Sequence, residues 1–380
     1  MNFNYTEEQL ALQDTLRRFI AKDYGFEHRR ALAKAEPGFS REAWAQYADF
    51  GLLALPFSED QGGLAGTPID TMLVMEMVGR GLLLEPYLQT VVVAGSLIRD
   101  YGTATQQAEL IPAVAGGELM MCLAHYEPEG RYDLHHVGTT AVRNANGWKI
   151  SGHKCVVIGA PSADKFIVSA RTSDGTRDEH GISLFVVDRG APGLTLRSYP
   201  TQDGGRAAEV HLDHVQVGTD DLVGELNKGY VMVERAIDFG IAGLCAEAVG
   251  VMSALIEVTL EYLKTRKQFG APLAKFQALQ HRMADMAIAT EQSRSMAILA
   301  AVGAKTDDAE TRNRDITAAK AYIGQQARLV GQQAIQLHGG MGVTDELNVS
   351  HYFKRLTMIC ATFGDTDHHL GRFSATLMAA

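Results

Sequence analysis

Hydrophobic positions recur at helical spacing through the first third of the chain. Residues 6–9, Thr-Glu-Glu-Gln, have the form of a capping box, and Leu10, Leu12 and Leu16 begin the apolar stripe that follows. Further helical segments are predicted over residues 69–80, 87–99 and 102–119, separated by turn-rich breaks near 36–38 and 59–63. This pattern predicts an N-terminal helical domain over residues 1–118.

The middle third changes to a period of two. Residues 142–150 read as two strands around an Asn-Gly turn, and 166–170, 182–187 and 208–212 are further β-rich or alternating runs. Short strands at this spacing indicate a compact β-barrel or sandwich, and we expect a barrel over residues 119–222.

The last third returns to helical periodicity, and Pro272 is the only proline after Gly224. Long periodic segments cover 229–265, 274–304 and 311–338, and a final helix is predicted after about Asp365. Helices joined by short loops pack as a bundle, so residues 223–380 are predicted to form a C-terminal four-helix bundle. The fold class is therefore α+β and mostly α.

Composition narrows the choice of partners. The chain has 380 residues, of which 46% are hydrophobic and 21% charged, and its net charge of −10 disfavours non-specific binding to nucleic acid or anionic membranes. The first eight residues are polar, and we see no apolar run near the roughly 18 residues of a membrane span. We expect a cytoplasmic protein with reduced cysteines. No metal site is expected, because His338, His368 and His369 lack acidic or cysteine companions.

Two segments of the last third carry candidate chemistry. The first is Arg266-Lys-Gln-Phe-Gly270, and the second is Gln336-Leu-His-Gly-Gly-Met-Gly342. An arginine donates to phosphate in a planar, bidentate geometry, and adjacent glycines let backbone amides approach a phosphate closely. A helix end with a surface arginine and a glycine cap is the plainer interpretation of the first segment alone. Together the segments suggest a phosphate-bearing cofactor.

The order and spacing of these segments resemble the C-terminal domain of the acyl-CoA dehydrogenase family. Leu52–Pro56, Gln61–Gly63 and Glu76–Arg80 also fall in the order of that family, as does its helical, β, helical architecture. The resemblance implies FAD as the cofactor and a homotetramer or a heterotetramer with a paralogous subunit.

Several cofactor-binding residues follow from the resemblance. It implies that Arg266 contacts the pyrophosphate, with Gln268 and Phe269 beside it, and that Gln336 and Gly340 meet the diphosphate and ribose from a neighbouring subunit. The same resemblance implies cofactor roles for Thr366 and His368.

The flavin-ring site departs from the family pattern. Tyr126 stands where relatives have a threonine that bonds the ring, while Val156 and Ile158 replace a stacking tryptophan and a polar threonine. Tyr126 can still donate a hydrogen bond, but it is far larger than threonine. The ring site is therefore remodelled or weakened.

The catalytic base of the family is missing from both of its usual positions. Gly364 and Gly240 stand where relatives carry a glutamate, and Ile241 replaces an arginine. Glu247, nearly two helical turns after Gly240, is one candidate base, and its alternatives are a buried ion pair or a partly exposed helix face. Asp365 is the second candidate, and its alternative is a cap of the final helix. The base could also come from elsewhere, or be absent.

The resemblance implies α,β-dehydrogenation of an acyl-CoA thioester, in which a carboxylate removes the α-proton and the flavin accepts a hydride. Segments 245–250 and 363–370 are similar to the small-subunit type of pimeloyl-CoA dehydrogenase. That similarity implies a dicarboxyl- or bulky acyl-CoA substrate and electron-transferring flavoprotein as acceptor. Two alternatives stay open: a non-catalytic partner subunit, and a flavin oxidase or monooxygenase that uses Asp365 or His369.

Overall fold

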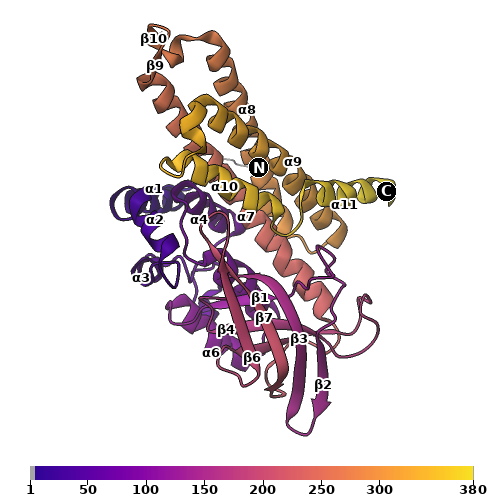
Figure 1. Ribbon diagram of the computed structural model, residues 1–380. Helices are drawn as coiled ribbons and strands as arrows, with labels where there is room; N and C mark the ends of the chain where they lie inside the picture. The colour runs from indigo at the N-terminus through magenta and orange to yellow at the C-terminus, as the bar shows by residue number, and fades with distance from the viewer. Residues whose placement is uncertain (1–4, 380) are drawn as a thin grey trace. The chain divides into compact units, whose positions relative to one another are not determined.

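The computed structural model describes residues 5–379, and it separates into two compact units that are described one at a time. The first comprises Met1–Ala31, Pro68–Leu83 and Ile241–Ala380, and the second comprises Leu32–Thr67 and Leu84–Gly240. Part of the polar N-terminal stretch used above, residues 1–4, lies outside the described residues. Figure 1 shows the helices and strands with the labels used from here on.

The N-terminal part of the first unit consists of α1 (Glu7–Asp23) and α4 (Pro68–Gly81). The predicted capping box is confirmed, because the Gln9 amide donates to Thr6 Oγ1 at 3.2 Å and the Thr6 amide donates to Gln9 Oε1 at 3.0 Å. Glycine lets α4 approach a later helix closely: a Cβ at Gly79 would lie 2.0 Å from the carbonyl oxygen of Glu247. The other N-terminal helical elements are α2 (Phe26–Lys34), α3 (Arg41–Asp49), the π-helical stretch Leu88–Ala94, α5 (Gly95–Tyr101) and α6 (Ala104–Ala115).

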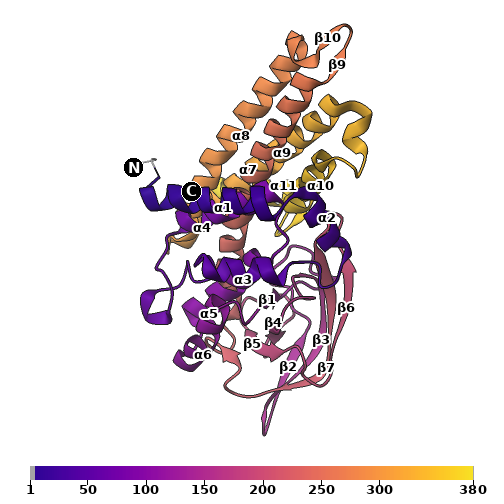
Figure 2. The ribbon, with the colours of Figure 1, turned by 90° about the vertical axis from the view of Figure 1, so that its left-hand side faces the viewer.

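An eight-stranded sheet dominates the second unit (Figure 2). Its path runs β6-β7-β3-β2-β4-β5-β8, and β1 pairs in parallel with β4 off this path. The predicted Asn-Gly hairpin is confirmed, because Asn144 at the end of β2 pairs with Gly147 at the start of β3. The strands are β1 (Met121–Ala124), β2 (Thr140–Asn144), β3 (Gly147–Ile158), β4 (Lys165–Arg171), β5 (Ile182–Asp188), β6 (Leu194–Pro200), β7 (Arg206–Val217) and β8 (Leu222–Val223).

Long helices form the C-terminal part, as predicted, and confirm the mostly α fold class. They are α7 (Gly229–Thr265), α8 (Gln277–Ala304), α9 (Ala309–His338), α10 (Asn348–Ala361) and α11 (Thr366–Ala379). Helix α10 is not among the helices that the sequence pattern predicts. Its buried Val349, Tyr352, Leu356 and Ile359 nevertheless recur at helical spacing, and they form the apolar stripe that stabilises it.

Helix α7 also corrects the expectation of no long apolar run. It contains an 18-residue window with a mean hydropathy of 1.9, which is long and apolar enough to cross a membrane by length and composition. However, 83% of that window is buried within the protein, as is common for a core helix. Location in the cytoplasm stays a prediction.

Candidate cofactor and active site

The Arg266 segment is a β-hairpin rather than a helix cap. Strands β9 (Lys267–Gln268) and β10 (Ala271–Pro272) pair antiparallel, with Gln268 opposite Ala271. The two residues of the turn, Phe269 and Gly270, have φ angles of 53° and 76°. A two-residue turn with two positive φ angles matches the right-handed twist of its strands, and the hairpin holds Arg266 at its base.

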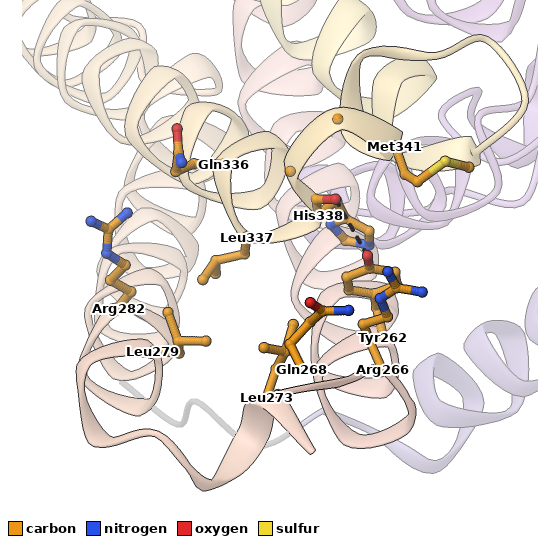
Figure 3. A pocket seen from close by; sticks show the side chains of 12 residues that line it. Tyr262, Arg266, Gln268, Leu273, Leu279, Arg282, Gln336, Leu337, His338 and Met341 are labelled. Carbon is orange, nitrogen blue, oxygen red and sulfur yellow. Dashed lines mark hydrogen bonds between the residues drawn. The ribbon is translucent and has the colours of Figure 1, made fainter. Parts of the chain in front are cut away.

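The hairpin and the end of α9 line one cleft of about 560 Å³ (Figure 3). Both segments singled out in the sequence therefore meet in a single chain, and no neighbouring subunit is needed to bring Gln336 and Gly340 to Arg266. The polar part of the lining includes Arg266, Gln268, Arg282, Gln336, and the backbone of Gly339 and Gly340. Its apolar part includes Leu273, Leu279, Leu337 and Met341.

The floor of the cleft is fixed by the end of α9. His338 is buried, its ring stacks on Tyr262 at a centroid distance of 4.4 Å, and the Tyr262 hydroxyl donates to the His338 carbonyl at 3.4 Å. Burial lowers the pKa of His338. Because its Nδ1 lies 2.8 Å from the Ala334 carbonyl, the ring is held in place as a neutral donor.

The lining fits the diphosphate of a dinucleotide. Among the described residues that form the cleft, none is acidic, and two are arginines. A Cβ built on Gly339 or Gly340 meets nothing within 4 Å, so their backbone faces open space where a phosphate can approach. Arg266, Gln268, Gln336 and Gly340 are thus placed together as cofactor-binding residues would be, whereas Phe269 is 88% exposed and does not line the cleft.

Thr366 and His368 lie elsewhere on the first unit. The Thr366 hydroxyl packs on Gly324 of α9, where a Cβ would lie 2.5 Å from it. Gly324 precedes Gln336 by twelve residues, about 18 Å along a helix that rises about 1.5 Å per residue. The cofactor residues implied by the resemblance therefore form two separate groups within this unit.

At Gly364, where relatives carry the catalytic glutamate, the imidazole rings of His368 and His369 fill the space that a side chain would need. Gly364 has a φ of 109°, and a Cβ there would lie 2.5 Å from His369 Nε2 and 2.7 Å from a ring carbon of His368. His369 is fully buried and donates from Nε2 to the Phe363 carbonyl at 2.9 Å. Burial, with Lys320 nearby, lowers its pKa to about 3, so it is a poor proton acceptor at neutral pH.

The two candidate carboxylates both have structural partners. Glu247 is 2% exposed and accepts two hydrogen bonds from Arg355, at 2.5 Å from Nε and 2.7 Å from Nη2. Asp365 is exposed and caps α11, because its Oδ1 accepts from the His368 amide at 2.9 Å. These are the alternatives that the sequence analysis left open, a buried ion pair and a helix cap, and they leave neither group free as the structure stands.

A buried charge network holds the backbone on both sides of Tyr126 in the second unit. Lys154 Nζ, fully buried, donates to the His125 carbonyl at 3.2 Å, to Glu127 Oε1 at 2.7 Å and to Ser169 Oγ at 3.0 Å. The Cys155 amide also donates to the Tyr126 carbonyl at 2.8 Å. The path of the chain through Tyr126 is therefore set by its buried neighbours.

The network has large pKa shifts with opposing causes. Burial alone would raise the pKa of Glu127, but the Lys154 ammonium and the hydrogen bond from the Thr139 amide outweigh it and lower that pKa to about 2. Burial lowers the pKa of Lys154 to about 8 against the attraction of Glu127. His125, buried beside Lys154, has its pKa lowered to about 3 and stays neutral.

At the remodelled ring positions the structure shows backbone strain rather than a stacking surface. Val156 lies within a register shift of β3, has a φ of 49° and is 50% exposed. A β-branched residue rarely adopts such a φ. Cys155 beside it has its pKa raised to about 11, chiefly by burial.

Sequence reasoning missed two polar residues of the cleft, Arg282 and Tyr262. Tyr262 precedes Arg266 by one helical turn, a spacing that could have placed both on one face. Arg282 comes from α8, and no local pattern marks it. Among residues 5–379, no group of three or more His, Cys, Asp or Glu side chains could hold a metal ion.

Comparison with known proteins gives matches along nearly the whole chain. Residues 6–118, 122–215 and 227–378 match the models described as acyl-CoA dehydrogenase N-terminal, middle and C-terminal domains. The probable acyl-CoA dehydrogenase YngJ of Bacillus subtilis (strain 168) is 30% identical over 359 residues, which cover 93% of each chain.

Solved structures also match nearly the whole chain. A variant of the Tcur3481-Tcur3483 steroid ACAD is 30% identical, with a TM-score of 0.87 and 98% of each chain covered. A structure described as the electron transferring flavoprotein of Acidaminococcus fermentans is 25% identical, with a TM-score of 0.92 over all of both chains.

Proposed function

Since this chain belongs to the acyl-CoA dehydrogenase family, whose cofactor is FAD, we propose that it takes part in the α,β-dehydrogenation of an acyl-CoA thioester. The observation that carries the proposal is the cleft in which Arg266, Gln268, Gln336 and Gly340 converge, with no acidic residue among the described residues of its lining. That donor set suits the diphosphate of FAD.

The chemistry divides between cofactor and protein. FAD, when bound, supplies the acceptor for the hydride that leaves the β-carbon. In the proposal Arg266 and the Gly339-Gly340 backbone bind and orient the diphosphate, and Tyr126 donates toward the ring from a backbone fixed by Lys154. A carboxylate must still remove the α-proton. Proton removal is the step for which this chain has no carboxylate without a structural partner at the candidate positions.

The residues at and near the family's base positions favour a second candidate function. In it, this chain is a partner subunit that transfers no proton itself. Gly240 and Gly364 carry no side chain, Glu247 is engaged by Arg355 through both oxygens, and Asp365 caps a helix. A base must reach the substrate proton within hydrogen-bonding distance, which an ion-paired carboxylate does not do without losing its partner. In this version a paralogous chain supplies the carboxylate.

Two features of the relatives support the finer details. The Tcur3481-Tcur3483 enzyme has a two-part name and is described as a steroid ACAD, which supports a paired assembly and a bulky acyl-CoA substrate here. The Acidaminococcus structure supports electron-transferring flavoprotein as the acceptor. We expect a tetramer, either of this chain alone or with the paralogue, and a role in β-oxidation of such acyl chains.

The test is anaerobic flavin bleaching by a panel of acyl-CoA thioesters, measured on the purified chain and on the chain co-purified with a paralogous dehydrogenase subunit. Bleaching of the chain alone supports dehydrogenation with a base of its own. Bleaching only in the complex supports the partner-subunit version. A chain that takes up no FAD in either form contradicts both.

Peroxide release tests the remaining alternative, a flavin oxidase or monooxygenase. The low basicity of buried His369 and the capping role of Asp365 argue against it. We therefore expect electrons from bleached flavin to pass to electron-transferring flavoprotein with little peroxide formed in air. Stoichiometric peroxide would overturn this assignment.

A further inference from the structure

The cofactor cleft contains a second arginine that the family resemblance did not indicate. Arg282 projects from α8 on the side of the cleft opposite Arg266, which lies at the end of α7 (Figure 3). The two arginines therefore line one cleft from different helices.

Arg282 is oriented by α9. Its Nη1 donates to Gln333 Oε1 at 3.1 Å, and Gln333 precedes Gln336 by three residues, which places both glutamines on one face of that helix. This bond uses one of the five donors of the guanidinium, so the other donors remain for an anion. Gln333 thus holds the Arg282 head group beside Gln336.

The charge around the two arginines is unbalanced. Within residues 5–379 neither Arg266 nor Arg282 forms an ion pair with a carboxylate, although the chain as a whole has a net charge of −10. Asp285 is the acidic residue nearest to Arg282 along α8, and the two line a neighbouring hollow of about 450 Å³, but no ion pair joins them. Two arginines facing one cleft in an acidic protein create a local site for an anion.

We propose that Arg282 is a second phosphate-binding residue of the cleft, so that Arg266 and Arg282 hold a dinucleotide diphosphate from opposite walls. This inference rests on the proposed function, in which the cleft binds FAD. A diphosphate has two charged phosphates, and each guanidinium matches one phosphate in a bidentate geometry. The Gly339-Gly340 backbone lines the same cleft, and there is open space where a Cβ of either residue would be.

The test is the dissociation constant of FAD for the deflavinated protein, measured by flavin fluorescence on the chain or on its complex with the paralogue. We expect Arg282→Gln to weaken FAD binding about tenfold, as for loss of one charge-assisted contact, and to lower the salt dependence of binding. Arg282→Lys should recover part of the affinity, because it keeps the charge and loses the bidentate fork. Arg314→Gln, which removes an exposed arginine of α9 paired with Asp315, is the matched control and should leave FAD affinity unchanged.

Competition by ADP and AMP separates a diphosphate contact from a general charge effect. The wild-type protein should prefer ADP to AMP as a competitor of FAD, and Arg282→Gln should reduce that preference. If Arg282→Gln changes neither FAD affinity nor the preference while Arg266→Gln weakens FAD binding, the inference is wrong and the proposed function stands. If Arg266→Gln also leaves FAD binding unchanged, the cleft is not the cofactor site and the proposed function falls with the inference.

Discussion

The diphosphate cleft and the region where a base is due are built in opposite ways. In the cleft, Arg266 and Arg282 face open space with no ion-pair partner among the described residues, and two glycines leave the backbone accessible. Around Gly364 and Glu247 the two candidate carboxylates are already engaged, because Glu247 pairs with Arg355 and Asp365 caps a helix terminus. The chain thus offers unpaired donors for binding a cofactor, while its carboxylates stabilise the fold.

The largest loss of stability is expected for substitution of Glu247, the candidate base that forms an ion pair with Arg355. Glu247→Gln removes the buried carboxylate charge that pairs with Arg355, and breaking a buried pair costs roughly 3–5 kcal/mol of unfolding free energy. Urea unfolding measures this, and the rate of flavin bleaching should stay at the wild-type value. Glu257→Gln, which removes a more exposed partner of Arg80, is the control and should cost about 1 kcal/mol or less. Bleaching lost in a stably folded Glu247→Gln protein would restore Glu247 as the base.

The second unit offers a pH test of a similar buried pair. Because the pKa of Glu127 is lowered from 4.5 to about 2 in the folded state, its ionised form contributes stability that is fully present above pH 4.5 and is lost as the pH falls toward 2. Glu127→Gln should therefore lower stability at neutral pH by about 3 kcal/mol, as for breaking a buried pair, and flatten the loss of stability below pH 4.5. Urea midpoints between pH 6 and 3 measure both effects, with the exposed Glu129→Gln as control. An unchanged acid slope in Glu127→Gln would contradict this account.

Substitution of Arg266 tests whether the cleft binds the cofactor. Arg266→Gln removes a charged donor from a cleft that no acidic residue of the described chain lines, and we expect a loss of about 1.5–3 kcal/mol in FAD binding, with unchanged stability of the apoprotein. Equilibrium flavin fluorescence measures the first quantity and thermal unfolding the second. A large fall in apoprotein stability would mean that Arg266 stabilises the fold, contrary to its exposed position.

A glutamate introduced at Gly364 tests whether a carboxylate at this position can restore proton transfer. Gly364→Glu combines a positive φ with a Cβ 2.5 Å from His369, so we expect a cost of roughly 1–3 kcal/mol and no gain in bleaching. Gly364→Ala separates the backbone strain from the carboxylate, and the two variants should be destabilised alike. Faster bleaching by Gly364→Glu alone would show that the site accepts a base after all.

Prediction from sequence succeeded where the interactions are local. The Thr6 capping box and the Asn144–Gly147 hairpin involve residues three apart, and both formed as predicted. The partner of Glu247 lies 108 residues away on α10, a helix that was not predicted, so the ion pair could be named as an alternative but its partner could not. Arg282 was missed for the same reason, because only the packing of α8 against α9 brings it to Gln333.

The smallest effect concerns the remaining carboxylate. Asp365 accepts a hydrogen bond from the His368 amide at the start of α11, and loss of such a cap by Asp365→Ala should cost about 1 kcal/mol. Asp365→Asn keeps a capping oxygen but removes the charge, so its stability should be closer to wild type. Both variants should bleach at the wild-type rate, because a capping carboxylate at an exposed helix terminus takes no proton from the substrate. If Asp365→Asn folds normally yet loses bleaching, Asp365 is the base, and the contrast between an open cofactor cleft and fully engaged carboxylates no longer holds.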